Sequence, residues 1–343
     1  MRSNGIPKLN LSEIQNQHEK LKEYIKFTPA IEVQTPLVRK LFNNGRLFLK
    51  LECMQHTGTF KARGALSSVL SMAPESEKYG ITAVSAGNHA IAAAWAARIK
   101  NLSAKVVMQS SANAYRIALA QSEGAEVILA EDGKAAFAMA DHLVEIEKRT
   151  FIHPFEGKYI SLGTSGVGFE FLESVKELDA IIVSVGGGGL ISGIAAAVKQ
   201  IKADCMVYGV EPEGAASVSK SILVNKPVTL QSVSTIADSL APPMSLPYSF
   251  SLIKNYVDKI VTVTDDEICG AMAVYQQEFK LAVEPAAAAA LAAACGPLRE
   301  RLKNKNIGVV VCGANIDCET YLKLMNKGIE LIKSGKGGWL NIL

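Results

Sequence analysis

The sequence lacks several features that would assign it to common classes of protein. Its six cysteines form no Cys-x-x-Cys pair, so no zinc site or redox disulfide of that spacing is indicated, and reduced thiols in a cytoplasmic protein are expected. No stretch concentrates the lysines and arginines, and the net charge is only +3, which gives no electrostatic case for nucleic acid or an anionic membrane as partner. No apolar run reaches the roughly 18 residues of a membrane span, and the first residues contain no signal-peptide core.

The composition instead indicates a large folded protein. The chain has 343 residues, of which 49% are hydrophobic. It exceeds the roughly 250 to 300 residues at which a single core stops growing, so we expect two lobes. No cluster of proline or glycine marks a linker, so the lobes are expected to be interleaved. Near the start, Ser12 and Gln15 have capping-box spacing and predict a helix that lies on the body as an arm.

From residue 47 onward, short apolar runs alternate with helical segments. This pattern is typical of a parallel sheet that helices cover on both faces, so the predicted fold class is α/β. The alanine-rich segment from Pro285 to Cys295 is expected to be a tightly packed helix. The predicted strands are residues 47–51, 81–84, 105–108, 125–129, 180–185, 207–210, 260–263 and 307–311.

A lysine stands at an unfavourable place in the segment 57–64. Thr59 is predicted to cap a helix whose first turn contains Lys61. The positive end of the helix dipole and the neighbouring Phe60 would lower the pKa of the Lys61 amine, so that a nucleophilic amine able to form a Schiff base becomes accessible. An ordinary exposed lysine at a helix start is the alternative.

A run of glycines connects a buried strand to a helix, and it consists of Gly186, Gly187, Gly188 and Gly189, followed by Leu190. The unobstructed amides and the positive helix end would hold a phosphate group without any side chain. Ile191 and Ser192 stand where a dinucleotide fingerprint needs glycine, and no Gly-Lys-Ser/Thr follows. A phosphomonoester is therefore favoured over a nucleotide, and a flexible turn is the alternative.

Two further loops follow predicted strands. Ser85 and Asn88 begin a helix whose amides suit a substrate carboxylate, and Asn88 can bind a phenolate-type oxygen, although capping alone would also select these residues. Cys312 offers a neutral thiol, unlike the carboxylate that keeps a pyridinium nitrogen protonated, and a buried structural cysteine is the alternative. Together with Lys61 and the glycine run, these groups supply what pyridoxal phosphate requires.

These motifs resemble those of the fold-type II pyridoxal-phosphate enzymes, and within them the serine/threonine dehydratases (ammonia-lyases) and serine racemase. The similarity runs from about residue 35 to Asp317 and includes Thr-Gly-Thr-Phe-Lys-x-Arg-Gly, Ser-x-Gly-Asn-His, the glycine run, Thr-Ile-Ala-Asp, Val-Glu-Pro and Cys-Gly-Ala-Asn-Ile-Asp, in the family's order. The resemblance implies a two-lobed architecture. A parallel-sheet, cofactor-binding domain would comprise residues 1–82 and 157–343, and a smaller inserted α/β domain of residues 83–156 would bind substrate.

The resemblance also implies roles for single residues. Lys61 would form the Schiff base and move the substrate proton, and Cys312 would face the pyridine nitrogen. The other residues expected at the cofactor are Phe60, Asn88, Gly186, Gly187, Gly188, Gly189, Leu190 and Glu284. The residues expected at the substrate carboxylate are Ser85, Ala86, Gly87, Asn88 and His89.

A neutral group at the ring nitrogen makes the ring less electron-withdrawing, which disfavours a long-lived carbanion and favours prompt β-elimination. The expected activity is therefore dehydration of a 3-hydroxy L-amino acid, such as L-threonine or L-serine, to a 2-oxo acid and ammonia. The resemblance implies that racemases carry a serine acid/base directly before Gly-Asn-His, where this chain has Ala86. The alternatives are a β-replacing synthase or racemase of the same family, and a non-catalytic sensor of a phosphate ligand.

The chain also departs from the family's pattern. Ser239 follows Asp238 where glycine is usual, and an unusual segment 241–244, Ala-Pro-Pro-Met, comes next. These departures leave open a 3-hydroxy amino acid bulkier than threonine, or an acidic one, as the substrate. The expected partners are a small-molecule amino acid and further copies of the chain in a homodimer or larger homo-oligomer, with no nucleic acid and no membrane.

A cation site is a further expectation that rests on the resemblance. Similar enzymes bind a cation through a glutamate, a backbone carbonyl and an aspartate, and this chain has Glu211, Ala215 and Ser217 at those places. Oxygen ligands suit magnesium, calcium or a monovalent ion, but a hydroxyl in place of a carboxylate weakens divalent affinity. A glutamate on a surface turn is the alternative.

Overall fold

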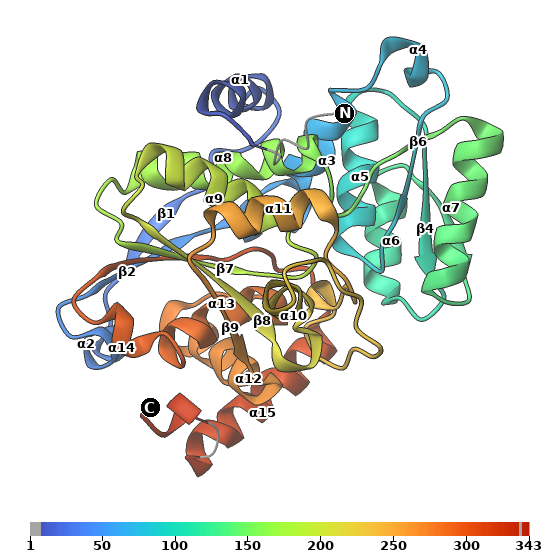
Figure 1. Ribbon diagram of the computed structural model, residues 1–343. Coiled ribbons are helices and arrows are strands. Elements are labelled where there is room, and N and C mark those ends of the chain that lie inside the picture. Colours follow the sequence, from blue (N-terminus) through green and yellow to red (C-terminus); the bar gives the residue numbers. More distant parts are fainter. Residues whose placement is uncertain (1–7, 336–337, 343) are drawn as a thin grey trace.

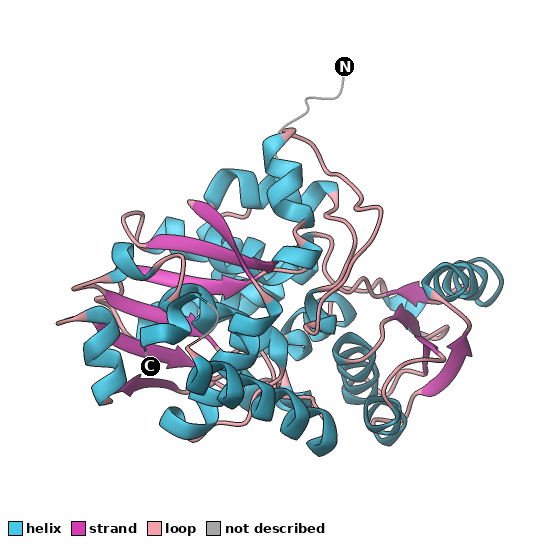
Figure 2. Cartoon of the chain, turned by 90° about the horizontal axis from the view of Figure 1, so that it is seen from below, coloured by secondary structure: helices cyan, strands magenta, loops and turns pink. Residues whose placement is uncertain are grey.

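The computed structural model describes residues 8–335 and 338–342. It contains two sheets that lie in separate lobes (Figure 1, Figure 2). The larger sheet has the order β1-β2-β10-β7-β8-β9, in which β1 runs antiparallel to β2 and the other neighbours are parallel. The smaller sheet, β5-β4-β3-β6, is parallel throughout. The strands are β1 (Ala30–Val33), β2 (Arg46–Lys50), β3 (Ile81–Val84), β4 (Ala104–Gln109), β5 (Glu126–Ala130), β6 (Thr150–Phe151), β7 (Ala180–Ser184), β8 (Met206–Pro212), β9 (Lys259–Val263) and β10 (Asn306–Val310).

Parallel sheets need covering helices on both faces, and the helices of the two lobes supply them. In the smaller lobe these are α5 (Asn88–Ile99), α6 (Ala114–Ser122) and α7 (Gly133–Glu147). The other helices are α1 (Leu11–Leu21), α2 (Pro36–Phe42), α3 (Lys61–Val69), α4 (Pro74–Glu77), α8 (Lys158–Ser174), α9 (Gly189–Ile201), α10 (Ser217–Leu223), α11 (Pro247–Tyr256), α12 (Asp265–Val274), α13 (Pro285–Cys295), α14 (Arg299–Leu302) and α15 (Cys318–Ser334). The α/β prediction is confirmed.

The predicted strands are all present, with ends that differ by two residues or fewer. The sequence analysis missed β1 and β6. β1 is a four-residue edge strand whose only partner in the sheet is β2, and β6 has two residues. Segments this short carry too few residues for a recognisable pattern, and their pairing partners lie elsewhere in the chain.

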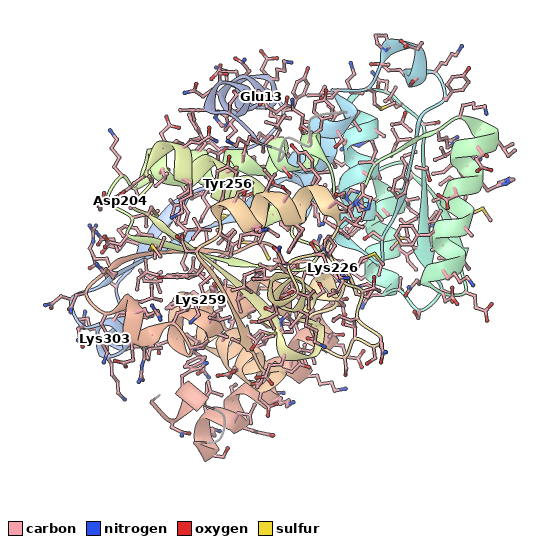
Figure 3. All side chains as sticks on the ribbon, in the orientation of Figure 1. Glu13, Asp204, Lys226, Tyr256, Lys259 and Lys303 are labelled. Atoms are coloured by element: carbon pink, nitrogen blue, oxygen red, sulfur yellow. The ribbon has the colours of Figure 1, made fainter. Side chains whose placement is uncertain are left out.

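The first helix lies on the body as predicted, but its cap is different. Asn10, not Ser12, is the N-cap, because its side chain accepts from the Glu13 amide at 2.9 Å while the Glu13 carboxylate accepts from the Asn10 amide. The Glu13 carboxylate also pairs with Lys158 at the start of α8, which ties α1 to the larger lobe; Figure 3 labels Glu13 on α1.

The core of the larger lobe is built around α13. Every residue of this alanine-rich helix is buried, as predicted, and it packs against β7, β8, β9 and β10. Small side chains allow the helix to approach the sheet closely over its whole length. Among the described residues, no helix combines the length and the apolar character needed to cross a membrane.

The smaller lobe has its own core, which α3 shares. Ala62 and Leu66 of α3 belong to the same buried cluster as Ile81 of β3 and Trp95 of α5. β3 also begins at Ile81, two residues before the predicted boundary at residue 83. The division into domains of residues 1–82 with 157–343, and 83–156, stays a prediction.

Candidate active site

The residues predicted for the cofactor and the substrate meet in one pocket of about 590 Å³ to which both lobes contribute. Loops that follow β3, β6, β7 and β10 line it, at the carboxyl ends of parallel strands, where α/β proteins place their ligands. The contacts these residues make with a ligand stay a prediction. The predicted residues that line the pocket are Phe60, Lys61, Ser85, Ala86, Gly87, Asn88, His89, Gly186, Gly187, Gly188, Gly189, Leu190, Glu284 and Cys312.

Lys61 is the first residue of α3, in the first turn where the sequence predicts it. The cap differs slightly, since Phe60 has helical dihedrals and takes the N-cap position, while the Thr59 hydroxyl accepts from the Lys61 amide at 3.3 Å. The Lys61 Nζ donates to the Pro154 carbonyl and lies 5.2 Å from the centroid of the Phe60 ring. Burial lowers the pKa of the Lys61 amine to about 8, against the attraction of nearby acidic groups. A fraction of this amine is therefore neutral near physiological pH.

The glycine run forms the turn from β7 into α9, and its geometry accepts only glycine at several positions. A methyl group at Gly187 would lie 2.3 Å from the Phe155 ring, and one at Gly189 would lie 2.6 Å from the Phe155 carbonyl oxygen. Gly188 has a φ of +97°, which residues with side chains rarely adopt. Glycine thus lets Phe155 pack against the turn, and the amides at the N-terminus of α9 suit a bound anion.

Asn88 and Glu284 are hydrogen-bonded across the pocket. The Asn88 Nδ2 lies 2.9 Å from each carboxylate oxygen of Glu284 and 3.1 Å from the Ser239 hydroxyl. Burial raises the pKa of Glu284 to about 7, although Arg116 and Asn88 oppose the shift. The pocket therefore holds two groups, Lys61 and Glu284, that titrate near neutral pH, which is characteristic of catalytic sites.

Burial keeps Cys312 and His89 neutral. The thiol follows β10, and burial raises its pKa well above the ordinary value, which agrees with the neutral partner that the sequence predicts. The His89 Nε2 donates to the Ile152 carbonyl at 2.7 Å, and burial lowers the pKa of this imidazole to about 3. The His89 side chain is thus packed and hydrogen-bonded within the protein. The groups of this loop that could bind a carboxylate are the backbone amides of residues 85–89.

The sequence analysis missed Arg116, which reaches from α6 to the larger lobe. Its Nη1 donates to Asp238 and its Nε donates to the Asn315 carbonyl at 2.9 Å, while its Nη2 lies 3.6 Å from Glu284. The Arg116 side chain is only 7% exposed. No motif surrounds this arginine, and its partners lie more than 100 residues away in the chain. No local pattern could have identified it.

His153 is a second pocket residue that the sequence did not indicate. Its Nδ1 accepts from the amides of Phe155 and Glu156, at 3.2 and 2.9 Å. The neutral ring must therefore carry its proton on Nε2. Burial and the charge of Lys61 lower the pKa of His153 to about 4, so the imidazole is a neutral donor across the physiological range.

The predicted cation ligands lie apart from this pocket, where β8 leads into α10. Both carboxylate oxygens of Glu211 accept hydrogen bonds, one from the Val218 amide at 2.7 Å and the other from the amide and hydroxyl of Ser219. Ser217 is buried, and its hydroxyl has no hydrogen-bond partner among the described residues. The cation site stays a prediction, and the internal hydrogen bonds of Glu211 weigh against it because they occupy the carboxylate.

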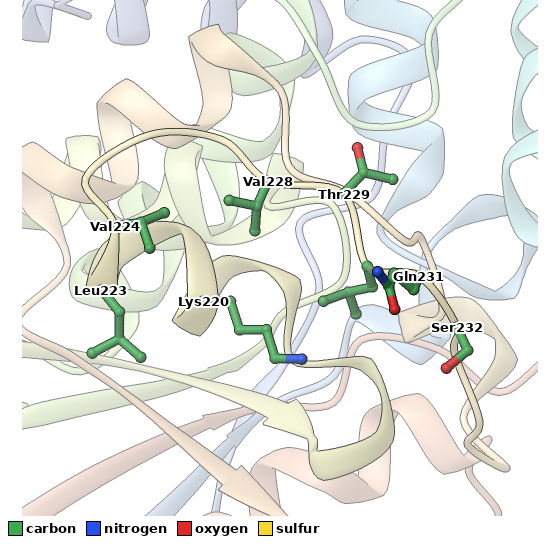
Figure 4. Close-up of a pocket in the computed structure, with 8 residues that line it drawn as sticks. Lys220, Leu223, Val224, Val228, Thr229, Gln231 and Ser232 are labelled. Atoms are coloured by element: carbon green, nitrogen blue, oxygen red, sulfur yellow. The ribbon is translucent and has the colours of Figure 1, made fainter.

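A second hollow, of about 440 Å³, lies between α10 and the loop that follows it (Figure 4). None of the predicted site residues is among those that line it. Most of its lining side chains are exposed, and they include Lys220, Leu223, Val224, Val228, Thr229, Leu230, Gln231 and Ser232. The groups described above, Lys61, Glu284 and Cys312, line the larger pocket.

Comparison with known proteins identifies relatives of this chain. Residues 25–313 match the family described as pyridoxal-phosphate dependent enzymes. Phenylserine dehydratase of Ralstonia pickettii is 42% identical over 321 residues, which cover 93% of this chain and 97% of the relative. L-threonine ammonia-lyase of Thermotoga maritima is 34% identical and covers 85% of this chain, with 72% of its own length matched.

Solved structures agree with the fold. The structure of maize serine racemase superposes with a TM-score of 0.86 at 31% identity, over 94% of this chain and 99% of that chain. The two-lobed, parallel-sheet architecture that the resemblance implied is therefore the architecture of this chain.

Proposed function

This chain belongs to the family of pyridoxal-phosphate dependent enzymes and is a lyase that dehydrates a 3-hydroxy L-amino acid, and we propose that its preferred substrates carry a bulky apolar group on C3. The products are a 2-oxo acid and ammonia. The observation that carries the finer proposal is the apolar wall that Phe137, Met244 and Leu246 contribute to the pocket.

The pocket fits the cofactor that the family requires. Gly187 and Gly189 carry no side chain that could cover the turn before α9, and the amides at the N-terminus of this helix suit a phosphate. Lys61 is a partly neutral amine within the same pocket, and Cys312 is a neutral group at the end of β10. These features support the predicted assignments. The glycine run would hold the phosphate, Lys61 would bind the aldehyde, and Cys312 would face the ring nitrogen.

Bound there, pyridoxal phosphate supplies an aldehyde that links covalently to an amine and a ring that withdraws electrons from C2 of the substrate. In the arrangement we propose, Lys61 takes the proton from C2 and Asn88 donates to the ring oxygen. The backbone amides of residues 85–89 hold the substrate carboxylate. Once Lys61 holds the C2 proton, its ammonium would return this proton to the departing C3 hydroxyl, which leaves as water. The resulting enamine takes up water and gives the 2-oxo acid and ammonia.

The contacts of Arg116 argue against an acidic substituent on C3. Of the described residues that line the pocket, Arg116 carries a permanent positive charge and is already paired with Asp238, while Lys61 is partly neutral. A second carboxylate on the substrate would have to break that pair. An aryl or other apolar group would instead lie on Phe137 and the Pro-Met segment 242–244 and gain from burial.

The experiment that tests the proposal is a comparison of kcat/KM for 2-oxo acid release from phenylserine, threonine, serine and 3-hydroxyaspartate, without a second substrate. We expect kcat/KM for phenylserine to exceed kcat/KM for threonine by about 10-fold or more, since burial of even one extra methylene group in an apolar pocket raises kcat/KM about 10-fold. A preference for 3-hydroxyaspartate would contradict the proposed substrate class. A requirement for a second substrate would instead identify a β-replacing synthase.

Truncation of the apolar wall is expected to reduce this preference. Phe137→Ala should lower kcat/KM for phenylserine about 10-fold and change the value for serine much less, because serine is too small to reach the ring. Phe27→Ala is the matched control, since Phe27 is 53% exposed, comparable to the 46% of Phe137, but does not line the pocket. Equal losses for both substrates would show that Phe137 does not select for size.

Racemisation is expected to be slow because Ala86 offers no acid or base on the second face of the substrate. We expect D-isomer formation to be about 100-fold slower than dehydration in the wild-type protein. Ala86→Ser should raise the ratio of racemisation to dehydration, as measured by chiral chromatography of the remaining amino acid. D-isomer formation at a rate near that of dehydration in the wild type would contradict this assignment.

The lowered pKa of Lys61 predicts how cofactor capture depends on pH. Only the neutral amine attacks an aldehyde, and its fraction grows as pH rises through the pKa of about 8. The association rate of pyridoxal phosphate with the apoprotein should therefore rise with pH and level off above about pH 9. Stopped-flow absorbance measures this rate. A rate that still increases in proportion to hydroxide at pH 10 would indicate a lysine with an ordinary pKa.

We also propose that the protein is a cytoplasmic homodimer or larger homo-oligomer that binds no nucleic acid. The cysteines are all free thiols, and Cys205, Cys269, Cys295 and Cys312 are buried, which is compatible with a reducing compartment. Light scattering coupled to size-exclusion chromatography measures the oligomeric state, and a monomeric mass would contradict that part of the proposal.

A further inference from the structure

The side-chain amide of Asn88 is held between two partners on opposite ends. Its Oδ1 accepts from the Nδ2 of Asn315 at 2.9 Å, and its own Nδ2 donates to Glu284 at 2.9 Å. Both asparagines are 6% exposed, so water competes little for these hydrogen bonds. The amide of Asn88 thus has one defined orientation, and the orientation decides whether a donor or an acceptor faces a ligand.

The hydrogen bonds from Asn315 to Thr57 and to Asn88, and from Asn88 to Glu284, form a relay. Its direction is fixed at the Thr57 end, by a carbonyl group that can only accept. The Thr57 carbonyl receives a hydrogen bond of 2.8 Å from Asn315, so the atom of Asn315 that touches it must be its NH₂ group. The same NH₂ group donates its second hydrogen to Asn88, so the side-chain carbonyl of Asn88 must face Asn315. The Glu284 carboxylate accepts at the far end, which agrees with the same orientation.

The loop before Lys61 is strained in a way that supports this relay. Thr57 has a φ of +63° and Gly58 a φ of +72°, and left-handed backbone is uncommon for a β-branched residue such as threonine. This turn directs the Thr57 carbonyl toward Asn315, and the Gly58 carbonyl accepts from the Ala314 amide at 3.0 Å. A methyl group at Gly58 would lie 2.5 Å from the Asn315 Oδ1. The turn and the asparagine therefore form one fitted unit.

We propose that Asn315 is a positioning residue that keeps the NH₂ end of Asn88 turned toward the ring oxygen of pyridoxal phosphate. The inference rests on the proposed role of Asn88 at that oxygen. A donor stabilises the ionised ring oxygen, whereas a rotated amide would present a carbonyl and repel it. Asn315 contacts neither the lysine nor the glycine run in the set of hydrogen bonds that the structure describes, and it acts through Asn88.

The test is the pH titration of the visible absorption band of the cofactor-loaded protein. Asn315→Asp has the same shape, but its carboxylate cannot donate to Thr57 or to Asn88. Asn88 should then rotate to donate to the new carboxylate and turn its own carbonyl toward the ring oxygen. We expect the apparent pKa of the band to rise by about one unit or more, and the dissociation constant of pyridoxal phosphate to rise about 10-fold.

A double-mutant cycle separates the relay from the direct effect of a new charge. In an Asn88→Ala background, Asn315→Asp should shift the titration much less, because the group through which it acts is missing. The charged and titratable groups around Asn88 are retained in every variant: Lys61, Arg116, Asp238, Glu284 and Cys312. An equal shift in both backgrounds would mean that the carboxylate acts directly, and would overturn the inference.

Asn315→Ser is the second variant, in case the aspartate prevents folding. It removes the paired donors without adding charge, so a smaller shift in the same direction is expected, again only when Asn88 is present. If the wild-type protein forms the visible band and neither Asn315 variant shifts its apparent pKa, this inference is overturned, while the proposed cofactor site stands. A wild-type protein that forms no visible band with pyridoxal phosphate overturns the proposed cofactor site and this inference with it.

Discussion

The Lys61→Ala variant is expected to lose turnover of 3-hydroxy amino acids by about 10⁴-fold or more, and to form no visible absorption band with pyridoxal phosphate. The side chain supplies both the amine that captures the aldehyde and the base that moves the C2 proton in the proposed arrangement. Its Nζ is enclosed beside the Phe60 ring and the Pro154 carbonyl, and its pKa is lowered to about 8. Absorbance and 2-oxo acid release measure the two losses separately.

Lys134→Ala is the matched control for this change. Lys134 also lies in the first turn of a helix, α7, but it is exposed and does not line the pocket. Its removal should leave both the absorption band and the turnover at wild-type values. A visible band that persists in Lys61→Ala, with turnover within 10-fold of the wild type, would mean that another amine captures the cofactor, and the proposed function would have to be revised.

Much of this site was predictable because its chemistry is contiguous in sequence. Lys61 stands at the start of a helix, and the glycine run joins a buried strand to a helix, so each can be recognised within about ten residues. The parallel topology of the larger sheet then brings the glycine run after β7 and Cys312 after β10 to one edge. The loop at Asn88 follows β3 of the smaller sheet, so it was joined to Cys312 by the groups that pyridoxal phosphate requires and by the family resemblance.

What the sequence could not indicate depends on partners that are distant in the chain. Asn315 was recognised as part of a motif, but its hydrogen bond to Asn88 spans 227 residues. Arg116 reaches Asp238 across 122 residues and has no motif around it. Such contacts arise only when the two lobes are packed together, and no periodicity or spacing within one segment encodes them.

The capping of α1 shows a local limit of the same kind. The chain carries two overlapping pairs with capping-box spacing, Ser12 with Gln15 and Asn10 with Glu13. Both satisfy the sequence rule, and only the backbone geometry selects the second. The Ser12 hydroxyl donates to the Asn10 side chain at 2.6 Å instead of capping the helix itself. Sequence rules therefore found the helix but not its first residue.

The helix that carries Lys61 is anchored by a buried ion-pair cluster. Arg63, which is fully buried, makes a bidentate pair with Glu52, at 2.7 and 2.8 Å, and another with Glu170 at the same distances. Lys50 adds a bond of 2.6 Å to Glu170. Burial tends to raise the pKa of Glu170, but the attraction of Arg63 and Lys50 prevails and the pKa is lowered. Glu170 thus depends on Arg63 and Lys50 to remain charged inside the protein.

Arg63→Met should therefore destabilise the protein by about 3 to 5 kcal/mol, the usual consequence of removing one partner of a buried ion pair. Methionine fills much of the same space, so the loss comes mainly from Glu52 and Glu170, which remain buried without their principal counter-charge. Denaturant unfolding monitored by tryptophan fluorescence measures the change. Arg46→Met is the matched control, because Arg46 also pairs with two glutamates, Glu32 and Glu177, but is 43% exposed. Its unfolding midpoint should stay close to that of the wild type.

The pH dependence of the loss distinguishes unpaired charge from a simple packing defect. In Arg63→Met, Glu170 is buried without the attraction of Arg63, so its folded-state pKa should rise above that of the unfolded chain. Folding then binds protons, and the deficit relative to the wild type should shrink as pH falls from 8 toward 5. A packing defect would cost the same at each pH. A deficit that is constant over this range would show that Arg63 stabilises α3 by its shape alone, and that the helix bearing Lys61 does not depend on the ion-pair cluster.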